Sequence, residues 1–275
     1  MKPKITAWTV VSFLLKVILM LIFIFPFYWM VITGFKTYQE SIAFPPSFWP
    51  AEFQWENFVK VWESGPYLLY MFNSFAVSLG CLILQFLIMV PASYAFAKME
   101  FKGRGFLFAL VMVAFMVPQQ VTFISIFHMM SRANLLKTLW PQILPHAANA
   151  FGLFLLRQNF MQIPDELLES ARLDNANEFQ ILTNVMLPMG KPTLVSILML
   201  SFITTWNNYF WPFIMASNQS VYPLTLGIDA LRDVEGSFDW QIIMAGNVIL
   251  VVPIIIVYAI FHKRIVRAFA YSGIK

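Results

Sequence analysis

Six long apolar runs divide this chain, and they restrict its fold more than any other feature of the sequence. About 20 consecutive apolar residues are enough for an α-helix to cross a bilayer. Charged residues make up only 12% of the sequence, about half of their usual share in soluble domains. We therefore predict an all-α, polytopic membrane bundle with six transmembrane helices, at Val10–Thr33, Phe72–Ala97, Phe106–Phe127, Gln142–Leu156, Thr193–Met215 and Ile242–Phe261.

The fourth run differs from the others because it contains small and polar residues. Pro145, His146, Asn149 and Gly152 all fall within it. Such residues indicate packing against other helices rather than exposure to lipid. We predict that residues 1–275 form a single transmembrane domain, in which this span packs against its neighbours.

Basic residues are unevenly divided between the two alternating sets of segments that join the spans. One set contains twelve of them and the other contains five. The positive-inside rule places the richer set, and with it both termini, in the cytoplasm. The predicted cytoplasmic set is Lys2, Lys4, Lys98, Lys102, Arg104, Arg157, Arg172, Lys191, Lys263, Arg264, Arg267 and Lys275, and the outer set is Lys36, Lys60, Arg132, Lys137 and Arg232.

Charged side chains are almost absent from the predicted spans, which contain only Lys16. A charge at membrane depth costs about 2.5–3.5 kcal/mol on insertion scales and is kept where function needs it. The sequence therefore argues against a proton or sodium symporter, a proton pump and a voltage sensor.

Residues for catalysis or cofactor binding are also missing. His128, His146 and His262 have no metal-ligand spacing, Cys81 is the only cysteine, and no G-x-x-x-x-G-K-[ST] phosphate loop occurs. The basic residues are scattered among membrane segments, which argues against a nucleic-acid partner. We predict a non-catalytic chain that binds no metal or cofactor, so any pumping would be driven by another subunit.

The polar stretch of residues 158–191 lies between the fourth and fifth predicted spans and has structure of its own. Pro164 suits a first helical position. Asp165 and Glu166 place negative charge in the first turn, where the helix dipole favours it. A short amphipathic helix is therefore predicted to begin there.

A turn and a second helix are predicted to follow. Asp174-Asn175 indicates the turn, because asparagine tolerates the left-handed backbone conformation better than most residues. The second helix is predicted to begin at Ala176, to run towards Leu187 and to end before Pro188. The predicted product is a helix-turn-helix on the cytoplasmic face.

The same stretch carries a spaced motif. Glu169, Ser170 and Ala171 are followed by Asn175 and, after nine further residues, by Val185, Leu187 and Pro188. This spacing resembles the loop of ABC importer permease subunits, which reads E-A-A-x-x-x-G, nine residues, then I-x-L-P. The chain departs from that pattern at Ser170, Asn175 and Val185, where the family has Ala, Gly and Ile; each replacement keeps size or backbone tolerance.

Further segments carry the resemblance over nearly the whole chain. IPDELLESARLDNA, LPMGKPTLVSILMLSFITTWNNYFWPFI, YPLTLGI and the ending SGIK look like the carbohydrate-importer branch, in its smaller, six-span, maltose-type permease. The resemblance implies a permease that moves a carbohydrate, an oligosaccharide in particular, across the bacterial inner membrane by ATP-driven alternating access. It also implies a second, different permease, two ATPase subunits that hold ATP and Mg, and an extracytoplasmic solute-binding protein.

In that family the first loop helix docks into a cleft of the ATPase and passes its closure to the spans. The resemblance thus implies an ATPase-coupling role for Glu169, Ser170, Ala171, Asp174, Asn175, Ala176, Leu187 and Pro188. The alternative is an amphipathic helix that only lies on lipid. That alternative explains the apolar face of the helix but not the spacing to Leu187-Pro188.

A polar and aromatic cluster in the fifth predicted span is a candidate substrate path. Trp206, Asn207, Asn208 and Tyr209 combine aromatic faces with amides, which suit the CH surface and the hydroxyls of a sugar. Hydrogen bonding between helices and an outer aromatic belt explain the cluster equally well. The alternative function is a channel or facilitator for a small polar solute without ATP coupling, and a membrane-embedded enzyme comes third.

Overall fold

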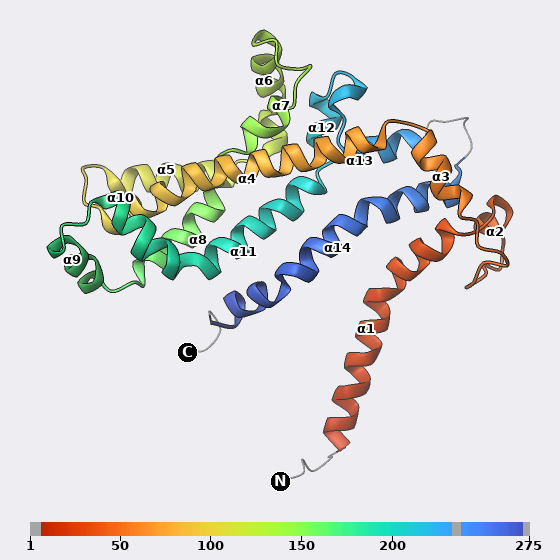
Figure 1. The fold of residues 1–275 in the computed structure, drawn as a ribbon, viewed down its shortest axis with the longest axis horizontal. Helices are drawn as coiled ribbons and strands as arrows, with labels where there is room; N and C mark the ends of the chain where they lie inside the picture. Colours follow the sequence, from red (N-terminus) through yellow and green to blue (C-terminus); the bar gives the residue numbers. More distant parts are fainter. Residues whose placement is uncertain (1–6, 233–237, 272–275) are drawn as a thin grey trace. The chain divides into compact units, whose positions relative to one another are not determined.

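The computed structural model describes residues 7–232 and 238–271, with side chains described as far as Ile260, and within these residues the regular structure is helical throughout (Figure 1). The all-α prediction is therefore confirmed. Lys2, Lys4, Lys275 and the SGIK ending lie outside the described residues. The α-helices are α1 (Ala7–Gly34), α2 (Tyr38–Ile42), α3 (Glu56–Glu63), α4 (Tyr67–Lys98), α5 (Arg104–Met116), α6 (Gln119–Arg132), α7 (Trp140–Ile143), α8 (Ala150–Met161), α9 (Asp165–Leu173), α10 (Glu178–Ile181), α11 (Leu187–Trp206), α12 (Phe210–Met215), α13 (Leu224–Asp229) and α14 (Trp240–Tyr271).

Four described helical stretches are long and apolar enough to cross a membrane, namely Trp8–Gly34, Tyr67–Lys98, Glu178–Trp206 and Trp240–Ile260. A fifth is obtained if α5 and α6 are taken as one bent span. The predicted first and second spans fall inside two of these stretches, and the sixth falls inside α14. None of the residues in the most apolar part of α1 is buried, so this helix needs lipid or a partner against its surface.

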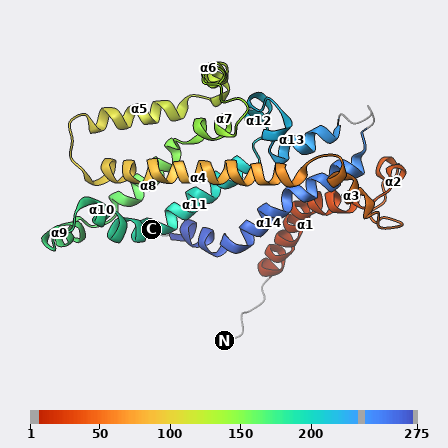
Figure 2. The ribbon, with the colours of Figure 1, turned by 45° about the horizontal axis from the view of Figure 1, so that its top comes forward.

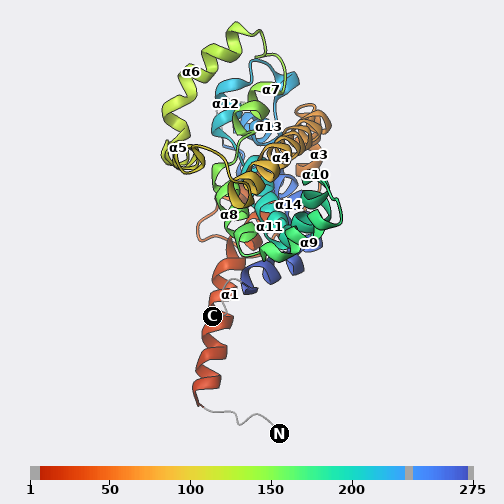
Figure 3. The same cartoon turned by 90° about the vertical axis from the view of Figure 1, so that its left-hand side faces the viewer.

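The predicted third span is interrupted in the structure. α5 and α6 meet at an angle of 96°, with the break at Val117-Pro118. Figure 2 shows α6 along its axis, and Figure 3 shows it turning away from α5. The ring of a proline pushes the preceding residue out of the helical region, and Val117 accordingly has an extended backbone, with ψ 118°. An uninterrupted helix over Phe106–Phe127 was therefore wrong.

The predicted fourth and fifth spans are also not single helices. Gln142–Leu156 is divided into the end of α7, a 3₁₀ turn at Leu144–His146 and the start of α8, which Asn149 caps by accepting a hydrogen bond from the Gly152 N–H at 2.7 Å. Thr193–Met215 breaks after Trp206, where α11 ends. Proline and asparagine in these runs offer the backbone local alternatives to a continuous helix, which hydropathy does not detect.

The described chain forms two compact units, one made of the residues up to Tyr67 with Gly227–Pro253 and the other of Leu68–Leu226 with the residues from Ile254. In the larger unit, buried residues of α4, α8, α11 and the 158–191 loop form one apolar core. Two glycines allow close packing there. A Cβ at Gly152 would lie 2.6 Å from Met89 Sδ, and one at Gly190 would lie 2.5 Å from Phe160 Cε1.

The smaller unit joins the end of α1 to the segment that follows it. Asn57 Nδ2 donates hydrogen bonds to Gly34 O at 3.0 Å and to Lys36 O at 2.8 Å. Lys36 is only 1% exposed; its ammonium donates to Ser47 O at 2.5 Å and lies 4.3 Å from the centre of the Trp29 ring. Burial lowers the pKa of this ammonium. A buried cation with these partners stabilises one conformation of the segment after α1.

Candidate functional site

The cytoplasmic loop predicted from the sequence is a helix-turn-helix in the structure. α9 begins one residue later than predicted, because Pro164 is the N-cap residue with an extended backbone rather than the first helical residue. Asp165 and Glu166 occupy the first turn, as predicted, and Arg172 occupies the last. Charges of these signs at these ends stabilise a helix through its dipole.

The turn after α9 is a Schellman motif built around Asn175. This residue has φ 60°, in the left-handed region. The Asn175 N–H donates to Arg172 O, and the Ala176 N–H donates to Ala171 O, both at 3.0 Å. These two bonds satisfy carbonyl groups that the helix end leaves open, and the motif is usually accompanied by an apolar contact between its ends. Ala171 and Ala176 both pack against the core of the larger unit, which gives these two motif residues a structural role.

The second loop helix begins and ends differently from the prediction. Asn177 caps α10 in a capping box with Gln180, so the helix starts at Glu178 rather than at Ala176. The Asn-x-x-Gln pattern was a visible signal for this start. The helix does not stop before Pro188. A π-helical segment, Leu182–Met186, joins it to α11, where Pro188 lies in the first turn.

The π-helical segment explains how the chain passes Pro188. The Leu187 N–H bonds to Leu182 O, five residues back, instead of following the usual four-residue pattern. A proline has no N–H to donate and would otherwise interrupt the helix. The wider turn shifts the hydrogen-bond pattern by one residue just before the proline, so the helix continues past it. The loop therefore continues into a membrane-spanning helix without a break.

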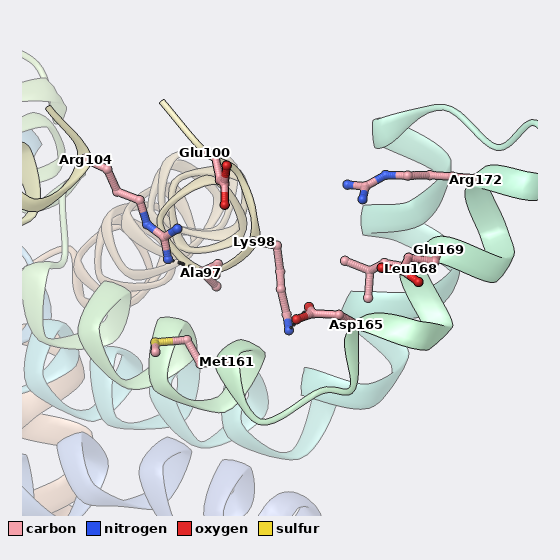
Figure 4. A pocket seen from close by; sticks show the side chains of 9 residues that line it. All are labelled: Ala97, Lys98, Glu100, Arg104, Met161, Asp165, Leu168, Glu169 and Arg172. Carbon is pink, nitrogen blue, oxygen red and sulfur yellow. Dashed lines mark hydrogen bonds and ion pairs between the residues drawn. The ribbon is translucent and has the colours of Figure 1, made fainter. Parts of the chain in front are cut away.

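Ionic contacts that the sequence did not reveal attach the loop to the end of α4. Lys98 Nζ lies 2.6 Å from Asp165 Oδ1 and donates to Ile163 O at 2.6 Å (Figure 4). The Tyr94 hydroxyl donates to Glu178, whose other carboxylate oxygen lies 3.1 Å from Arg172. The hydrogen bond with Glu178 raises the pKa of the Arg172 guanidinium. α9 and α10 are thus held to α4 as well as to each other.

The remaining faces of the loop divide between core and surface. Leu168 is 2% exposed and Ile181 is fully buried, so these two side chains anchor the loop in the core. Leu173 is 84% exposed and Phe179 is 73% exposed. Two large apolar side chains left in water are costly unless another surface covers them. The predicted residues Glu169, Ser170, Asp174 and Pro188 are also exposed, and Leu187 is half-buried.

A cavity of about 340 Å³ lies between α9 and the α4–α5 turn. Figure 4 shows Glu169 and Leu168 on α9 facing Lys98 and Glu100 of the opposite segment. Arg104 on that side donates to the carbonyl groups of Phe96 and Ala97, each at 3.0 Å. Acidic and basic side chains both line this cavity. Such a mixture of charges is better suited to contact with a polar surface of another protein than to binding one small ion.

A second cavity, of about 760 Å³, lies within the larger unit and is lined by α4, α5, α6, α8 and α11 with the segments around them. We call it the polar pocket. It is lined by apolar residues together with a set of amides, hydroxyls and one imidazole, contributed by Gln85, Gln119, Thr122, His146, Asn149, Ser201, Thr204, Thr205 and Asn208.

Only one of the four predicted substrate-path residues lines the polar pocket. This is Asn208. Trp206 is 1% exposed and packs against Phe75, with ring centres 4.7 Å apart. The Asn207 amide donates to Ile203 O at 3.0 Å, one turn back, and the Tyr209 ring stacks on Phe213 at 5.4 Å. Because α11 ends at Trp206, the following residues lie in the turn before α12, and the direction of that turn points these three side chains away from the pocket.

Residues 88–271 match the model of a family described as the binding-protein-dependent transport system inner membrane component. The chain belongs to this family. It is therefore a multi-pass inner membrane protein and a permease subunit of a transport system.

Several curated permease proteins are similar to this chain over nearly its whole length. A probable ABC transporter permease protein, YurM of Bacillus subtilis, is 32% identical over 91% of this chain and 83% of its own. The arabinooligosaccharides transport system permease protein AraQ of Halalkalibacterium halodurans is 29% identical over 92% and 91%. The sn-glycerol-3-phosphate transport system permease protein UgpE of Yersinia pestis is 27% identical over 94% and 95%.

A solved structure shares the fold. It is a crystal structure of a bacterial ABC transporter involved in the import of the acidic polysaccharide alginate, with a TM-score of 0.84 and 22% identity over 95% of this permease and 99% of the matched chain. The helix-turn-helix and the broken spans described above thus belong to a fold that an ABC transporter uses.

Proposed function

We propose that this permease carries a carbohydrate inward across the inner membrane as one subunit of an ABC importer driven by ATP hydrolysis on partner chains. The observation that carries the proposal is the helix-turn-helix of α9 and α10. It is fixed to α4 and continuous with α11, yet it leaves Leu173, Phe179 and Glu169 exposed. Such an element transmits a push from a cytoplasmic partner to membrane-spanning helices.

The ATPase is the partner proposed for that surface. Exposed apolar side chains surrounded by charges are typical of protein interfaces, and the motif residues from Glu169 to Pro188 occupy this loop. ATP and Mg would be held by the ATPase and not by this chain. A channel without ATP coupling would have no use for a docking loop attached so firmly to two spans.

The cargo and the remaining partners of this permease are inferred by analogy with its relatives. One relative belongs to an arabinooligosaccharide transport system, and a related complex of the alginate transporter contains a periplasmic protein with bound alginate pentasaccharide. By this analogy the importer takes an oligosaccharide from an extracytoplasmic binding protein, and a second, different permease and two ATPases complete it. The polar pocket, with aromatic and amide side chains, suits such a cargo.

Both termini are proposed to lie in the cytoplasm, and thiol labelling tests this orientation. Glu52 and Glu166 are exposed, whereas the native Cys81 is fully buried. We expect Glu52→Cys to react with an impermeant thiol reagent added to intact cells from outside. Glu166→Cys should react only after the membrane is opened. The wild-type chain, with Cys81 alone, is the control, and labelling of Glu166→Cys from outside would overturn the orientation.

Charge reversal on α9 tests the coupling role. Glu169 is exposed, so Glu169→Lys should leave the fold intact. At a docking surface the same change costs binding, and we expect at least a tenfold loss of transport per ATP hydrolysed, or failure to retain the ATPase. The measurement is sugar uptake and ATPase activity of the reconstituted importer.

The matched control for this test is Glu100→Lys. Glu100 is exposed and lines the same cavity, but it follows α4 instead of lying on α9. This variant should transport normally. Equal loss in both variants would assign the effect to charge alone, and normal transport by Glu169→Lys would refute the docking role.

A further inference from the structure

The relatives do not indicate whether the cargo of this permease is charged. The side chains that line the polar pocket do constrain its charge. None of the described residues that line this pocket is aspartate, glutamate, lysine or arginine. The nearest basic residue on α8, Arg157, is engaged elsewhere. It donates to Phe96 O at 3.0 Å, and its guanidinium lies 4.1 Å from the centre of the Phe108 ring. The pocket therefore offers no countercharge of its own to an ionised ligand.

The amides of the pocket are already held in place. Gln85, 5% exposed, donates to His146 O at 2.8 Å and accepts from the Asn149 amide at 3.3 Å. The Asn149 amide also donates to Ser201 Oγ at 3.0 Å, which joins α8 to α11. Polar side chains fixed by such bonds present a preorganised wall, so a ligand that meets them loses less free energy in ordering the site.

An aromatic surface lies beside these amides. Phe115 and Phe151 both line the pocket and stack on each other, with ring centres 5.8 Å apart and an interplanar angle of 21°. Aromatic faces bind the CH surfaces of a sugar ring, while amides and hydroxyls bond its hydroxyls. The combination suits a polyhydroxylated ligand better than a purely apolar one.

His146 supplies a polar atom that has no partner. Its ring packs edge-on against Trp211, with ring centres 5.4 Å apart. Its Nε2 atom is buried and has no hydrogen-bond partner in the described part of the chain. A buried polar atom without a partner is destabilising and is retained where something else satisfies it. His146 lines the polar pocket, but this atom is closed to solvent in the structure, so a ligand hydroxyl would satisfy it once the ring turns toward the pocket.

We propose that the polar pocket takes an uncharged, polyhydroxylated chain, a neutral oligosaccharide, and that His146 Nε2 hydrogen-bonds one of its hydroxyls. This inference rests on the proposed function and narrows its substrate class. An acidic glycan would have to leave its water shell for a pocket that supplies no cation, which is far more costly than the transfer of neutral hydroxyls into hydrogen-bonding positions.

The first test compares two probes of equal length in the complete importer. Uptake into proteoliposomes is measured with a neutral arabinopentaose and with a pentasaccharide of uronic acids, each with its ATP consumption. We expect uptake of the neutral probe to exceed that of the acidic one at least tenfold. Equal or faster uptake of the acidic probe would overturn the inference while leaving the importer assignment intact. Uptake of neither probe, and of no other oligosaccharide in a wider panel, would refute the proposed function itself.

A second test introduces the missing charge. Gln119 is exposed and lines the pocket, whereas Gln120, also exposed, does not line it. We expect Gln119→Lys to raise the ratio of acidic to neutral uptake at least tenfold and Gln120→Lys to leave it unchanged. An unchanged ratio in Gln119→Lys, with the importer assembled, would contradict the assignment of the pocket as the place where cargo charge is selected.

The contact with His146 is tested by removing its ring nitrogens. His146→Phe keeps an aromatic ring against Trp211 but no acceptor, so apparent affinity for the neutral probe should fall roughly threefold to tenfold, the value of one hydrogen bond. His128→Phe, on the exposed α6, is the control and should show no change. Unchanged affinity in assembled His146→Phe would refute the contact. If that variant does not assemble, His146→Gln carries the test, and we expect it to retain affinity within threefold of wild type, while a larger loss would refute the contact.

Discussion

We expect Gly152→Val to prevent assembly of the importer, because the larger unit has no space for a side chain at this position. A Cβ there would lie 2.6 Å from Met89 Sδ and 2.7 Å from Ile197 Cγ2, so it would push α8 away from both α4 and α11. Overpacking of a core costs about 1–3 kcal/mol and sometimes more, and the branched valine adds two further methyl groups. The measurement is the thermal stability and yield of the purified complex.

Gly105→Val is the matched control for this prediction. A Cβ at Gly105 would have no atom within 4 Å, and its φ does not require glycine. The same substitution should therefore leave yield and stability within normal variation. Comparable loss in both variants would mean that glycine matters for helix flexibility instead of close packing.

A valine at Asn175 should weaken coupling, whereas glycine should preserve it. The backbone at this position has φ 60°, which a β-branched residue adopts only with strain of about 1–3 kcal/mol, whereas glycine adopts it freely. The strain would break the Schellman motif and tilt α9, so we expect at least a tenfold loss of uptake in Asn175→Val. Asn175→Gly should transport as wild type.

Asn134 provides the control for backbone strain alone. It also has a positive φ, 56°, but follows α6 and lies outside the loop. We expect Asn134→Val to lower stability to a similar degree without uncoupling ATP hydrolysis from uptake. Wild-type uptake by Asn175→Val combined with loss in Asn175→Gly would show that Asn175 acts through its amide and not through its backbone conformation.

Local chemistry explains which parts of the loop could be predicted. The start of α9 follows from Asp165 and Glu166, and the left-handed turn at Asn175 follows from the tolerance of asparagine. Both are decided by residues adjacent in sequence. The attachment of the loop to α4 is not decided by adjacent residues. Tyr94 and Glu178 are 84 residues apart, and nothing in either segment indicates the other.

The candidate substrate path shows the same limit. Trp206, Asn207, Asn208 and Tyr209 form one polar and aromatic cluster in the sequence, but only Asn208 lines the polar pocket. The cluster lies at the end of α11 and in the turn before α12, so neighbours in sequence face different surroundings. Gln85 and His146 complete the pocket from segments that carried no sign of each other.

The apolar runs and the motif spacing by themselves determined that this chain is an all-helical membrane protein with a helix-turn-helix loop between two of its spans. Hydropathy and short-range backbone preferences act within a few residues, so they can be read along the chain. Only the tertiary structure decided where the spans break, how the loop is fastened to α4 and which side chains line the polar pocket. Those features depend on contacts between segments far apart in sequence, and helix phase and packing set them together.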